Sequence, residues 1–193
     1  MRLYYAVFFF SLALMTSAQC QLTAEDWKNN GDSLIAQGKY DEAIHAYEEA
    51  IRLDPNYAKA WCNTGVALYN QDKYDEAIRA YDEAIQLDPY FAKAWSNKGN
   101  ALNALGKYDD AIKCCNEAIR LDPHLAETWT IKGIVLRKQG KCDEAIQAYD
   151  EAIRINPNYA VAWYLKGHAL LLLGRTTEAN AAYAKAKELG YTS

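Results

Sequence analysis

The sequence from residue 24 onward alternates between apolar stretches with helical spacing and short polar turns. Trp61, Gly65 and Leu68 are separated by four and three residues, which places them on one face of an α-helix. After a turn, the same spacing returns from Ala77 to Ile85. This pattern predicts two amphipathic helices joined by a few polar residues.

The predicted helix pair recurs with a fixed period of 34 residues. Tryptophan, glycine, leucine and alanine each hold one position in every period. A period of this length indicates stacked helical units, because one unit alone cannot bury its apolar face. The five units are 24–57, 58–91, 92–125, 126–159 and 160–193, marked by Trp27, Trp61, Trp95, Trp129 and Trp163.

The predicted turns inside the units carry residues suited to a left-handed backbone. Four units have glycine there, and the second has Asp72. An acidic pair follows at once in the first four units, where carboxylates complement the positive end of the second helix and can cap its free amides. The turn glycines are Gly38, Gly106, Gly140 and Gly174, and the acidic pairs are 41–42, 75–76, 109–110 and 143–144.

Two further positions predict how the units pack. A glycine inside the first helix, such as Gly65, costs roughly 1 kcal/mol relative to alanine. Its recurrence in all five units predicts that a neighbouring helix lies too close for a methyl group. In unit five, Asn180 and Lys187 replace isoleucines that the first four units share. If those isoleucines cover the following unit, this polar replacement predicts a terminal, capping unit.

These residues resemble the tetratricopeptide repeat: tryptophan, glycine four residues on, leucine three later, a downstream alanine, an aromatic four after it, and Asp-Pro at the end. The resemblance covers Ala24 to Ser193. It implies an all-α fold, a right-handed superhelical solenoid of antiparallel helix–turn–helix repeats. It also implies a protein that binds other proteins or peptides.

The resemblance further implies that the first helix of each unit lines a concave groove. Units one to three would present amides and lysines there, and the last two units aliphatic side chains and a tyrosine. Such a gradient suits a peptide with a polar or acidic end and an apolar end. Alternatively, the apolar part is internal packing or a patch for self-association. The lining residues, carried over by position, are Lys28, Asp32, Lys59, Asn63, Val66, Tyr69, Lys93, Asn97, Asn100, Ile131, Ile134, Arg137, Tyr164, Leu165, His168 and Leu172.

One subclass of the family binds the C-terminal carboxylate of chaperones with five residues: Lys, Asn, Asn, Lys and Arg. Lys28, Asn63 and Lys93 stand at matching positions here. Asp32 replaces an asparagine and would repel a carboxylate, and Asn97 replaces the arginine. The sequence therefore argues against this clamp.

Composition and motifs argue against nucleic-acid binding, metal or cofactor use, and catalysis. The formal net charge is −4, with acidic and basic residues interspersed, so the chain lacks the basic stripe of a nucleic-acid-binding protein. The five cysteines lack C-x-x-C spacing. No histidine has a predicted nucleophile or carboxylate partner, and no glycine-rich phosphate loop occurs.

Two cysteines replace tyrosines of the earlier units, namely Cys115 and Cys142. Losing a large buried ring costs roughly 2–4 kcal/mol unless neighbours refill the space. Because both losses fall in successive units, one hypothesis is a disulfide between them after export. The simpler interpretation is small apolar packing.

The N-terminal segment, residues 1–18, breaks the repeat pattern. Arg2 precedes an apolar run of 16 residues that ends at Ala18, which is typical of an export signal. The run is shorter than the ~20 residues that span a bilayer comfortably, but an uncleaved membrane anchor is an alternative, and lipid attachment at Cys20 is a third. Residues 19–23 would then be a short linker. The protein would be exported, or anchored to a membrane by residues 1–18 alone.

The sequence therefore predicts a non-catalytic protein–protein interaction scaffold that binds a peptide or partner segment in its concave groove. The alternative is a self-assembling structural module of an extracytoplasmic or membrane-associated complex. The two differ in their dependence on protein concentration, because self-assembly follows mass action and a monomeric scaffold does not.

Overall fold

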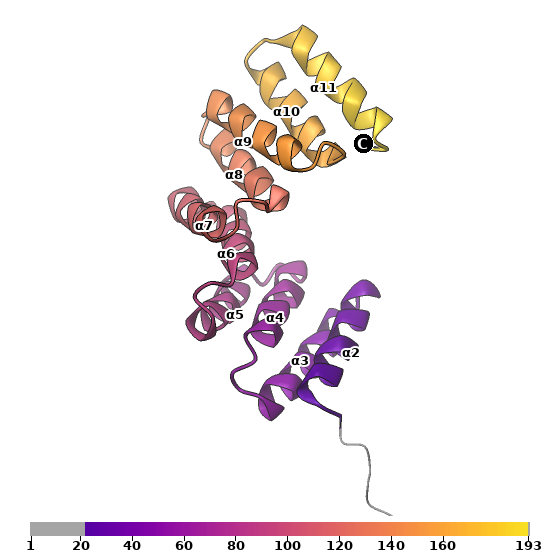
Figure 1. Ribbon diagram of the computed structural model, residues 1–193, viewed down its shortest axis with the longest axis vertical. Helices are drawn as coiled ribbons and strands as arrows, with labels where there is room; N and C mark the ends of the chain where they lie inside the picture. The colour runs from indigo at the N-terminus through magenta and orange to yellow at the C-terminus, as the bar shows by residue number, and fades with distance from the viewer. Residues whose placement is uncertain (1–21, 193) are drawn as a thin grey trace, which may run out of the picture.

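The computed structural model describes residues 22–192, and this part of the chain forms ten α-helices and no strand (Figure 1). The predicted all-α solenoid of antiparallel helix pairs is confirmed, with one pair in each period. The predicted signal or anchor at residues 1–18 lies outside the described residues, as does Cys20. The helices are α2 (Ala24–Ala36), α3 (Tyr40–Leu53), α4 (Ala58–Asn70), α5 (Tyr74–Leu87), α6 (Ala92–Ala104), α7 (Tyr108–Leu121), α8 (Ala126–Lys138), α9 (Cys142–Ile155), α10 (Ala160–Leu172) and α11 (Thr176–Glu188).

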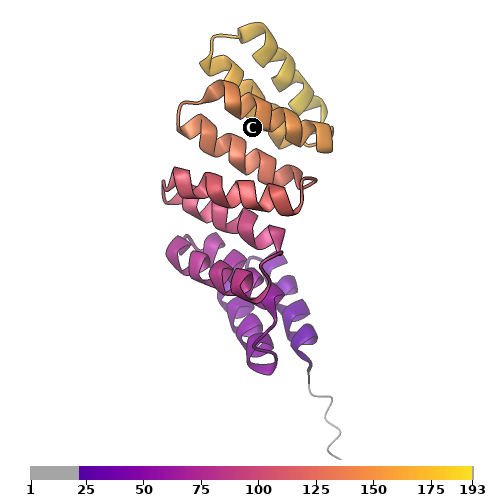
Figure 2. The same ribbon diagram turned by 60° about the vertical axis from the view of Figure 1, so that its left-hand side comes forward.

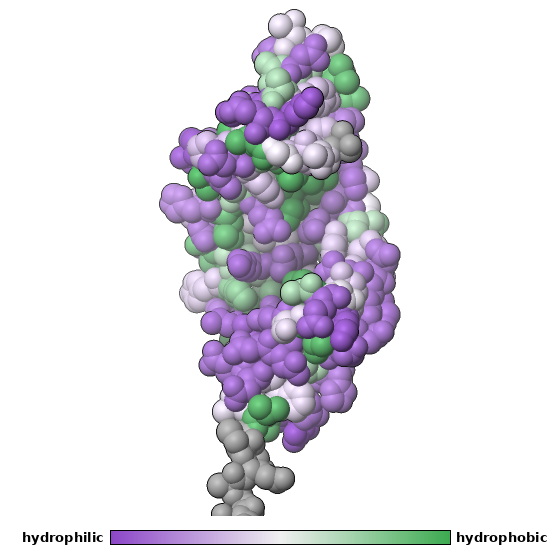
Figure 3. Space-filling view, turned by 90° about the vertical axis from the view of Figure 1, so that its right-hand side faces the viewer, coloured by the Kyte–Doolittle hydropathy of each residue, from purple (hydrophilic) through white to green (hydrophobic). Residues whose placement is uncertain are grey.

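The helix pairs stack along the long axis of the molecule in a curved array (Figures 1 and 2), and one face of this array is hollowed (Figure 3). Each first helix contacts the first helix of the next unit, as α4 contacts α6 and α6 contacts α8. In the described part of the chain, no second helix contacts another second helix. The first helices therefore lie on the inner side of the curve, and the second helices form its outer side. None of the described helices has both the length and the apolar character needed to cross a bilayer.

Within each unit, the glycine of the first helix faces the second helix at very short range. A methyl group at Gly65 would lie 2.5 Å from Cε1 of Tyr81, and one at Gly133 would lie 2.5 Å from Cε1 of Tyr149. Such distances are far inside van der Waals contact, so the two helices can pack this closely only around glycine. The predicted close approach is confirmed. In unit three the aromatic ring is absent, and the sulfur of Cys115 takes its place.

Between units, the isoleucines of the second helices join neighbouring cores. Ile78 packs against the apolar clusters of units two and three, and Ile112 against those of units three and four. Ile146 is buried in the same cluster as Leu170 of unit five. In unit five, the equivalent Asn180 is exposed. The expected polar outer face of the last unit is therefore present.

The turns inside the units have the left-handed backbone that their residues predict. All four turn glycines have positive φ, between 72° and 80°, and Asp72 has φ 59°. At the start of the chain, Thr23 and Asp26 form the reciprocal capping box: Thr23 Oγ1 accepts from the Asp26 amide at 3.1 Å, and Asp26 Oδ2 accepts from the Thr23 amide at 2.9 Å. The left-handed turns are confirmed as predicted from the sequence.

The acidic pairs differ from the prediction in one respect. They lie in the first turns of the second helices, but the N-caps of those helices make no side-chain hydrogen bond. Instead, Asp41 Oδ1 accepts from Nε2 of Gln71 in the next unit at 2.7 Å, and Asp109 Oδ1 accepts from Gln139 at 2.8 Å. The predicted side-chain capping is therefore not found: Asp41 and Asp109 instead link units, because the glutamine that ends the next first helix lies beside each of them.

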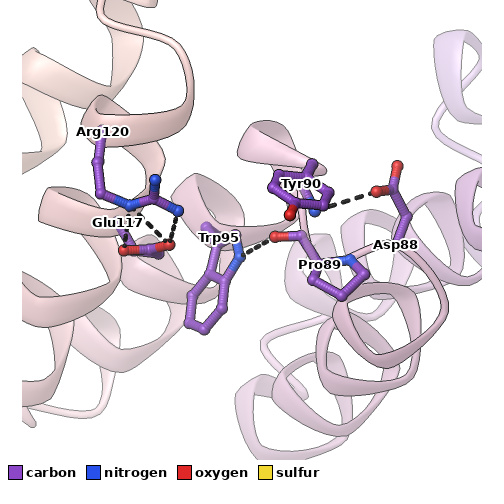
Figure 4. A network of polar contacts seen from close by, with 6 residues as sticks. All are labelled: Asp88, Pro89, Tyr90, Trp95, Glu117 and Arg120. Carbon is purple, nitrogen blue, oxygen red and sulfur yellow. Dashed lines mark hydrogen bonds and ion pairs between the residues drawn. The ribbon is translucent and has the colours of Figure 1, made fainter.

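Three of the tryptophans tie a linking turn to the helix that follows it. Trp95 Nε1 donates a hydrogen bond to the carbonyl oxygen of Pro89 at 3.2 Å (Figure 4). The same bond joins Trp129 to Pro123 at 3.2 Å and Trp163 to Pro157 at 3.0 Å. The recurring tryptophan and proline thus act together to fix the angle between successive units.

Candidate functional site: the concave groove

The hollowed face carries polar and apolar residues in different parts (Figure 3). Hydrophobic colour gathers in the upper, C-terminal part of the hollow, and hydrophilic colour covers most of the lower part. Among the predicted lining residues, Lys59, Lys93 and Leu172 are exposed, and most of the others are half-buried. Along this face the hydropathy changes from polar in the lower part to more apolar in the upper part.

At the N-terminal end, Asp32 of α2 holds together three neighbours. Its Oδ1 accepts hydrogen bonds from the Tyr47 hydroxyl and from Nδ2 of Asn63, both at 2.8 Å, and its Oδ2 pairs with Lys28 Nζ at 2.6 Å. The hydrogen bond to Asp32 raises the pKa of Lys28. The pKa of Tyr47 is also raised, mainly by burial and to a lesser extent by its hydrogen bond to Asp32. Lys28, Asp32 and Asn63 therefore satisfy one another, and this end of the groove is closed to a second carboxylate.

Three successive units form a pocket of about 200 Å³ in the middle of the groove. Four predicted residues come together there, namely Asn63, Val66, Lys93 and Asn97. Two further lining residues, Ser96 and Thr128, are buried and share a hydrogen bond of 2.9 Å between their hydroxyl oxygens. The remaining lining residues are Cys62, Phe91, Leu125 and Glu127.

The sequence analysis did not identify Phe91 and Leu125, whose apolar side chains line this pocket. Each is the last residue of its unit, directly before the next first helix. An apolar residue at that position in a linking turn was the available signal. The other predicted residues of this region, Tyr69 and Asn100, lie beside one another, and the Asn100 side chain lowers the burial-raised pKa of Tyr69.

In the C-terminal half, part of the predicted groove is internal packing. Ile131 is 5% exposed and belongs to the apolar cluster of Leu102 and Val135. Ile134 and Leu165 pack against the next cluster. Ile131 is therefore not a free groove residue: a branched aliphatic chain at this position turns inward, whereas the asparagines of the earlier units stay half-buried.

The end of the array carries a larger pocket, of about 670 Å³. Tyr164 stacks on Tyr191, with ring centroids 4.3 Å apart, and lies 5.5 Å from the ring of Tyr183. Tyr164 therefore faces this terminal pocket. Nearby on the chain, Leu171, Leu172 and Leu173 are 49%, 57% and 39% exposed. The remaining lining residues of the pocket are Ala186, Lys187, Gly190 and Thr192.

The four cysteines of the described residues are buried free thiols. The disulfide considered between Cys115 and Cys142 is not formed in the structure. Cys115 fills the space beside Gly99, where its sulfur would lie 3.0 Å from an added methyl group. Burial raises the pKa of Cys62 to about 11 and that of Cys115 to about 12, which keeps both thiols protonated at neutral pH. Residues 22–192 contain no group of three or more side chains suited to hold a metal ion.

Comparisons with known proteins agree with this architecture. The family model of the cilia and flagella-associated protein 70 C-terminal domain matches residues 9–159, and a tetratricopeptide repeat model matches residues 132–190. A comparison with curated proteins found no match.

Several solved structures are similar to this chain. A crystal structure of MamA is 29% identical to this chain and superposes with a TM-score of 0.70. The match covers 82% of this chain and 93% of the MamA chain. TTC0263, a tetratricopeptide repeat protein of Thermus thermophilus, is 22% identical, with coverage of 87% and 92% and a TM-score of 0.78. YrrB, described as a tetratricopeptide repeat protein with an unusual peptide-binding site, is 22% identical, with coverage of 86% of each chain and a TM-score of 0.64.

The family models, the solved structures and the helix pairs lead to one conclusion. The repeat positions that the sequence defines are the positions that pack the units, from the glycine–tyrosine contact to the tryptophan–proline bond. This chain belongs to the tetratricopeptide repeat family, and the model of the cilia and flagella-associated protein 70 C-terminal domain spans most of its length.

Proposed function

We propose that this protein is a non-catalytic scaffold that binds a segment of a partner protein in its concave groove. The observation that carries the proposal is the mid-groove pocket, which three successive units build from amide, lysine and apolar side chains. A pocket of this mixture suits an extended peptide, whose backbone needs amide partners and whose side chains need apolar contacts. A peptide-binding site in YrrB, a protein of similar fold, supports the same class of function.

A displayed random-peptide library, selected on the full chain, tests this proposal. We expect enriched peptides whose binding is lost in Lys93→Glu, because Lys93 is exposed at the rim of the pocket and reversing its charge disturbs no packing. The matched control is Lys113→Glu on α7, an exposed lysine of an outer helix. Failure to enrich any peptide, or equal loss with both variants, would contradict groove binding.

A second candidate is self-assembly through the C-terminal end of the array. Three consecutive exposed leucines, 171 to 173, and the terminal pocket of the same unit favour it. Light scattering over a concentration series distinguishes a monomer from an assembly. Leu172→Glu should abolish any concentration-dependent growth, and growth that persists in this variant would contradict association through this patch.

The proposed site of action is outside the cytoplasm or at a membrane surface. The support is the sequence pattern of residues 1–18, with one basic residue, an apolar run and a small-residue exit. The intact mass of the protein from its host tests this: a mass starting at Gln19, or one bearing a lipid, supports export. A full-length mass in the cytosolic fraction contradicts it.

A further inference from the structure

Arg137 of α8 is a half-buried cation without an anionic partner. Its Nε atom is buried and makes no hydrogen bond. None of the ion pairs within residues 22–192 involves its guanidinium. Burying an uncompensated charge is unfavourable, and such groups are normally paired. The buried Nε of Arg137 therefore lacks the partner that such a group normally has, and no ion pair of the described residues balances the charge of the guanidinium.

Two further unpartnered polar atoms accompany Arg137. The hydroxyl of Tyr149 on α9 is fully buried and donates to no acceptor, because the Arg137 guanidinium beside it can itself only donate. Burial raises the pKa of Tyr149 to about 12, and the adjacent Arg137 guanidinium opposes that rise. On α10, Nδ1 of His168 is buried and unpartnered.

The repeat predicts that Arg137 and His168 lie beside each other, because their helices, α8 and α10, contact each other. Arg137 occupies the position of Tyr69 two units earlier, and His168 the position of Asn100. Tyr69 and Asn100 lie side chain to side chain: burial raises the pKa of Tyr69, and the Asn100 amide partly opposes that rise. The same register places His168 of unit five beside Arg137 of unit four.

Unit one shows what is missing in unit four. There Tyr47, the equivalent of Tyr149, donates to the carboxylate of Asp32, which is also paired with a cation, Lys28. In unit four the equivalent of Asp32 is Ile134. Unit four therefore has the tyrosine hydroxyl and a cation, but the chain supplies no carboxylate between them.

We infer that Arg137, Tyr149 and His168 form a subsite for a carboxylate of the bound partner segment. The guanidinium offers a planar pair of donors that matches a carboxylate, and the hydroxyl and imidazole add polar contacts. The inference rests on the proposed peptide-binding function. The carboxylate comes from an Asp or Glu side chain or from a free C-terminus. The subsite lies in units four and five, whereas Asp32 already fills the anion's place at the other end of the groove.

The test uses two random-peptide libraries displayed on phage, one with the C-terminus of each peptide fused and one with it free. Both are selected on the full wild-type chain. We expect an acidic residue at one fixed position in the first library, or a shared requirement for the free terminus in the second. The library that enriches identifies the source of the carboxylate.

Synthetic peptides then measure affinity. Arg137→Met should weaken binding by about tenfold or more, since a charge-assisted pair is lost, and Tyr149→Phe should weaken it several-fold. The matched control is Arg154→Met, which removes an exposed arginine paired with Glu151 and should leave binding unchanged. Neutralising the peptide carboxylate, as Asn, Gln or a C-terminal amide, should weaken binding to the wild type but not further to Arg137→Met. The melting temperature of Arg137→Met should equal or exceed that of the wild type, which a structural role for Arg137 would not give.

The possible outcomes distinguish the carboxylate subsite from the proposed peptide binding in the groove. Enriched peptides without a carboxylate requirement, or unchanged affinity for the neutralised peptide, would overturn the subsite and leave groove binding intact. No enrichment in either library would overturn groove binding and the subsite together. Because the neutralised peptide is measured on the wild-type chain, this result does not depend on how any variant folds.

Discussion

The ring of Tyr81 lies so close to Gly65 that a methyl group on the glycine would sit 2.5 Å from its Cε1 atom. This contact sets the spacing between α4 and α5. Gly65→Ala should therefore destabilise the protein by about 1–3 kcal/mol, because the overpacking outweighs alanine's better helix propensity. Urea unfolding, followed by circular dichroism, measures the change.

Gly99 offers an internal control for this prediction. A methyl group there would meet the Cys115 sulfur at 3.0 Å and the Ala111 carbonyl oxygen at 3.3 Å, with no aromatic ring in the way. We expect Gly99→Ala to cost less than Gly65→Ala by about 1 kcal/mol or more. Equal costs would show that the ring does not set the helix spacing.

The Asp32–Tyr47 hydrogen bond should contribute measurably to stability. It is part-buried and its acceptor is charged, so a double-mutant cycle of Asp32→Ala and Tyr47→Phe should give a coupling of about 1 kcal/mol. Glu49→Ala breaks an exposed ion pair with Arg52 and should have no measurable effect. Additive effects of Asp32→Ala and Tyr47→Phe would mean that the hydrogen bond contributes nothing.

Most of the fold could be predicted from the sequence because the repeat displays its main local signals in four or five units. A single glycine such as Gly65 inside a helix is ambiguous, but five in register predict a close contact, and the structure has it. The turn glycines are local signals of the same kind. Their physical cause lies within a few residues of sequence.

The groove was less predictable because it depends on contacts between units. Asp32 looks like a free acid in the sequence, yet residues 15 and 31 positions further along the chain bind it. Ile131 occupies the same repeat position as Asn97 but is buried, because an apolar side chain at this position packs into the core whereas a polar one stays half-buried. Asp41 was predicted to cap its own helix. Its partner, Gln71, belongs to another unit, so the contact could not be predicted from the local sequence.

The thiols of Cys115 and Cys142 should be inaccessible in the folded protein. Both are buried and free, so alkylation at neutral pH should label them only after unfolding in urea. Mass spectrometry of the two proteolytic peptides that contain Cys115 and Cys142 measures their alkylation separately from that of the other cysteines. A linked pair of peptides in unreduced protein from its host would instead show that the disulfide forms there.

Stability should fall in alkaline solution, and Cys115 should account for part of the fall. Burial raises its pKa from 9.0 to about 12. Above pH 9 the unfolded chain releases this proton while the folded chain keeps it, so the contribution is complete below pH 9 and is lost between pH 9 and 12. The slope for one such group is about 1.4 kcal/mol per pH unit. The buried tyrosines Tyr47 and Tyr81 act with the same sign, because burial raises their pKa values also.

The test of the Cys115 contribution is therefore a difference of slopes. Cys115→Ala should lose stability less steeply over this range than the wild type, as measured by urea unfolding at a series of pH values. Val135→Ala leaves a cavity in the same apolar cluster but removes no ionisable group, so its slope should match the wild type. If Cys115→Ala and Val135→Ala had equal slopes, ionisation of Cys115 would have no part in the alkaline loss.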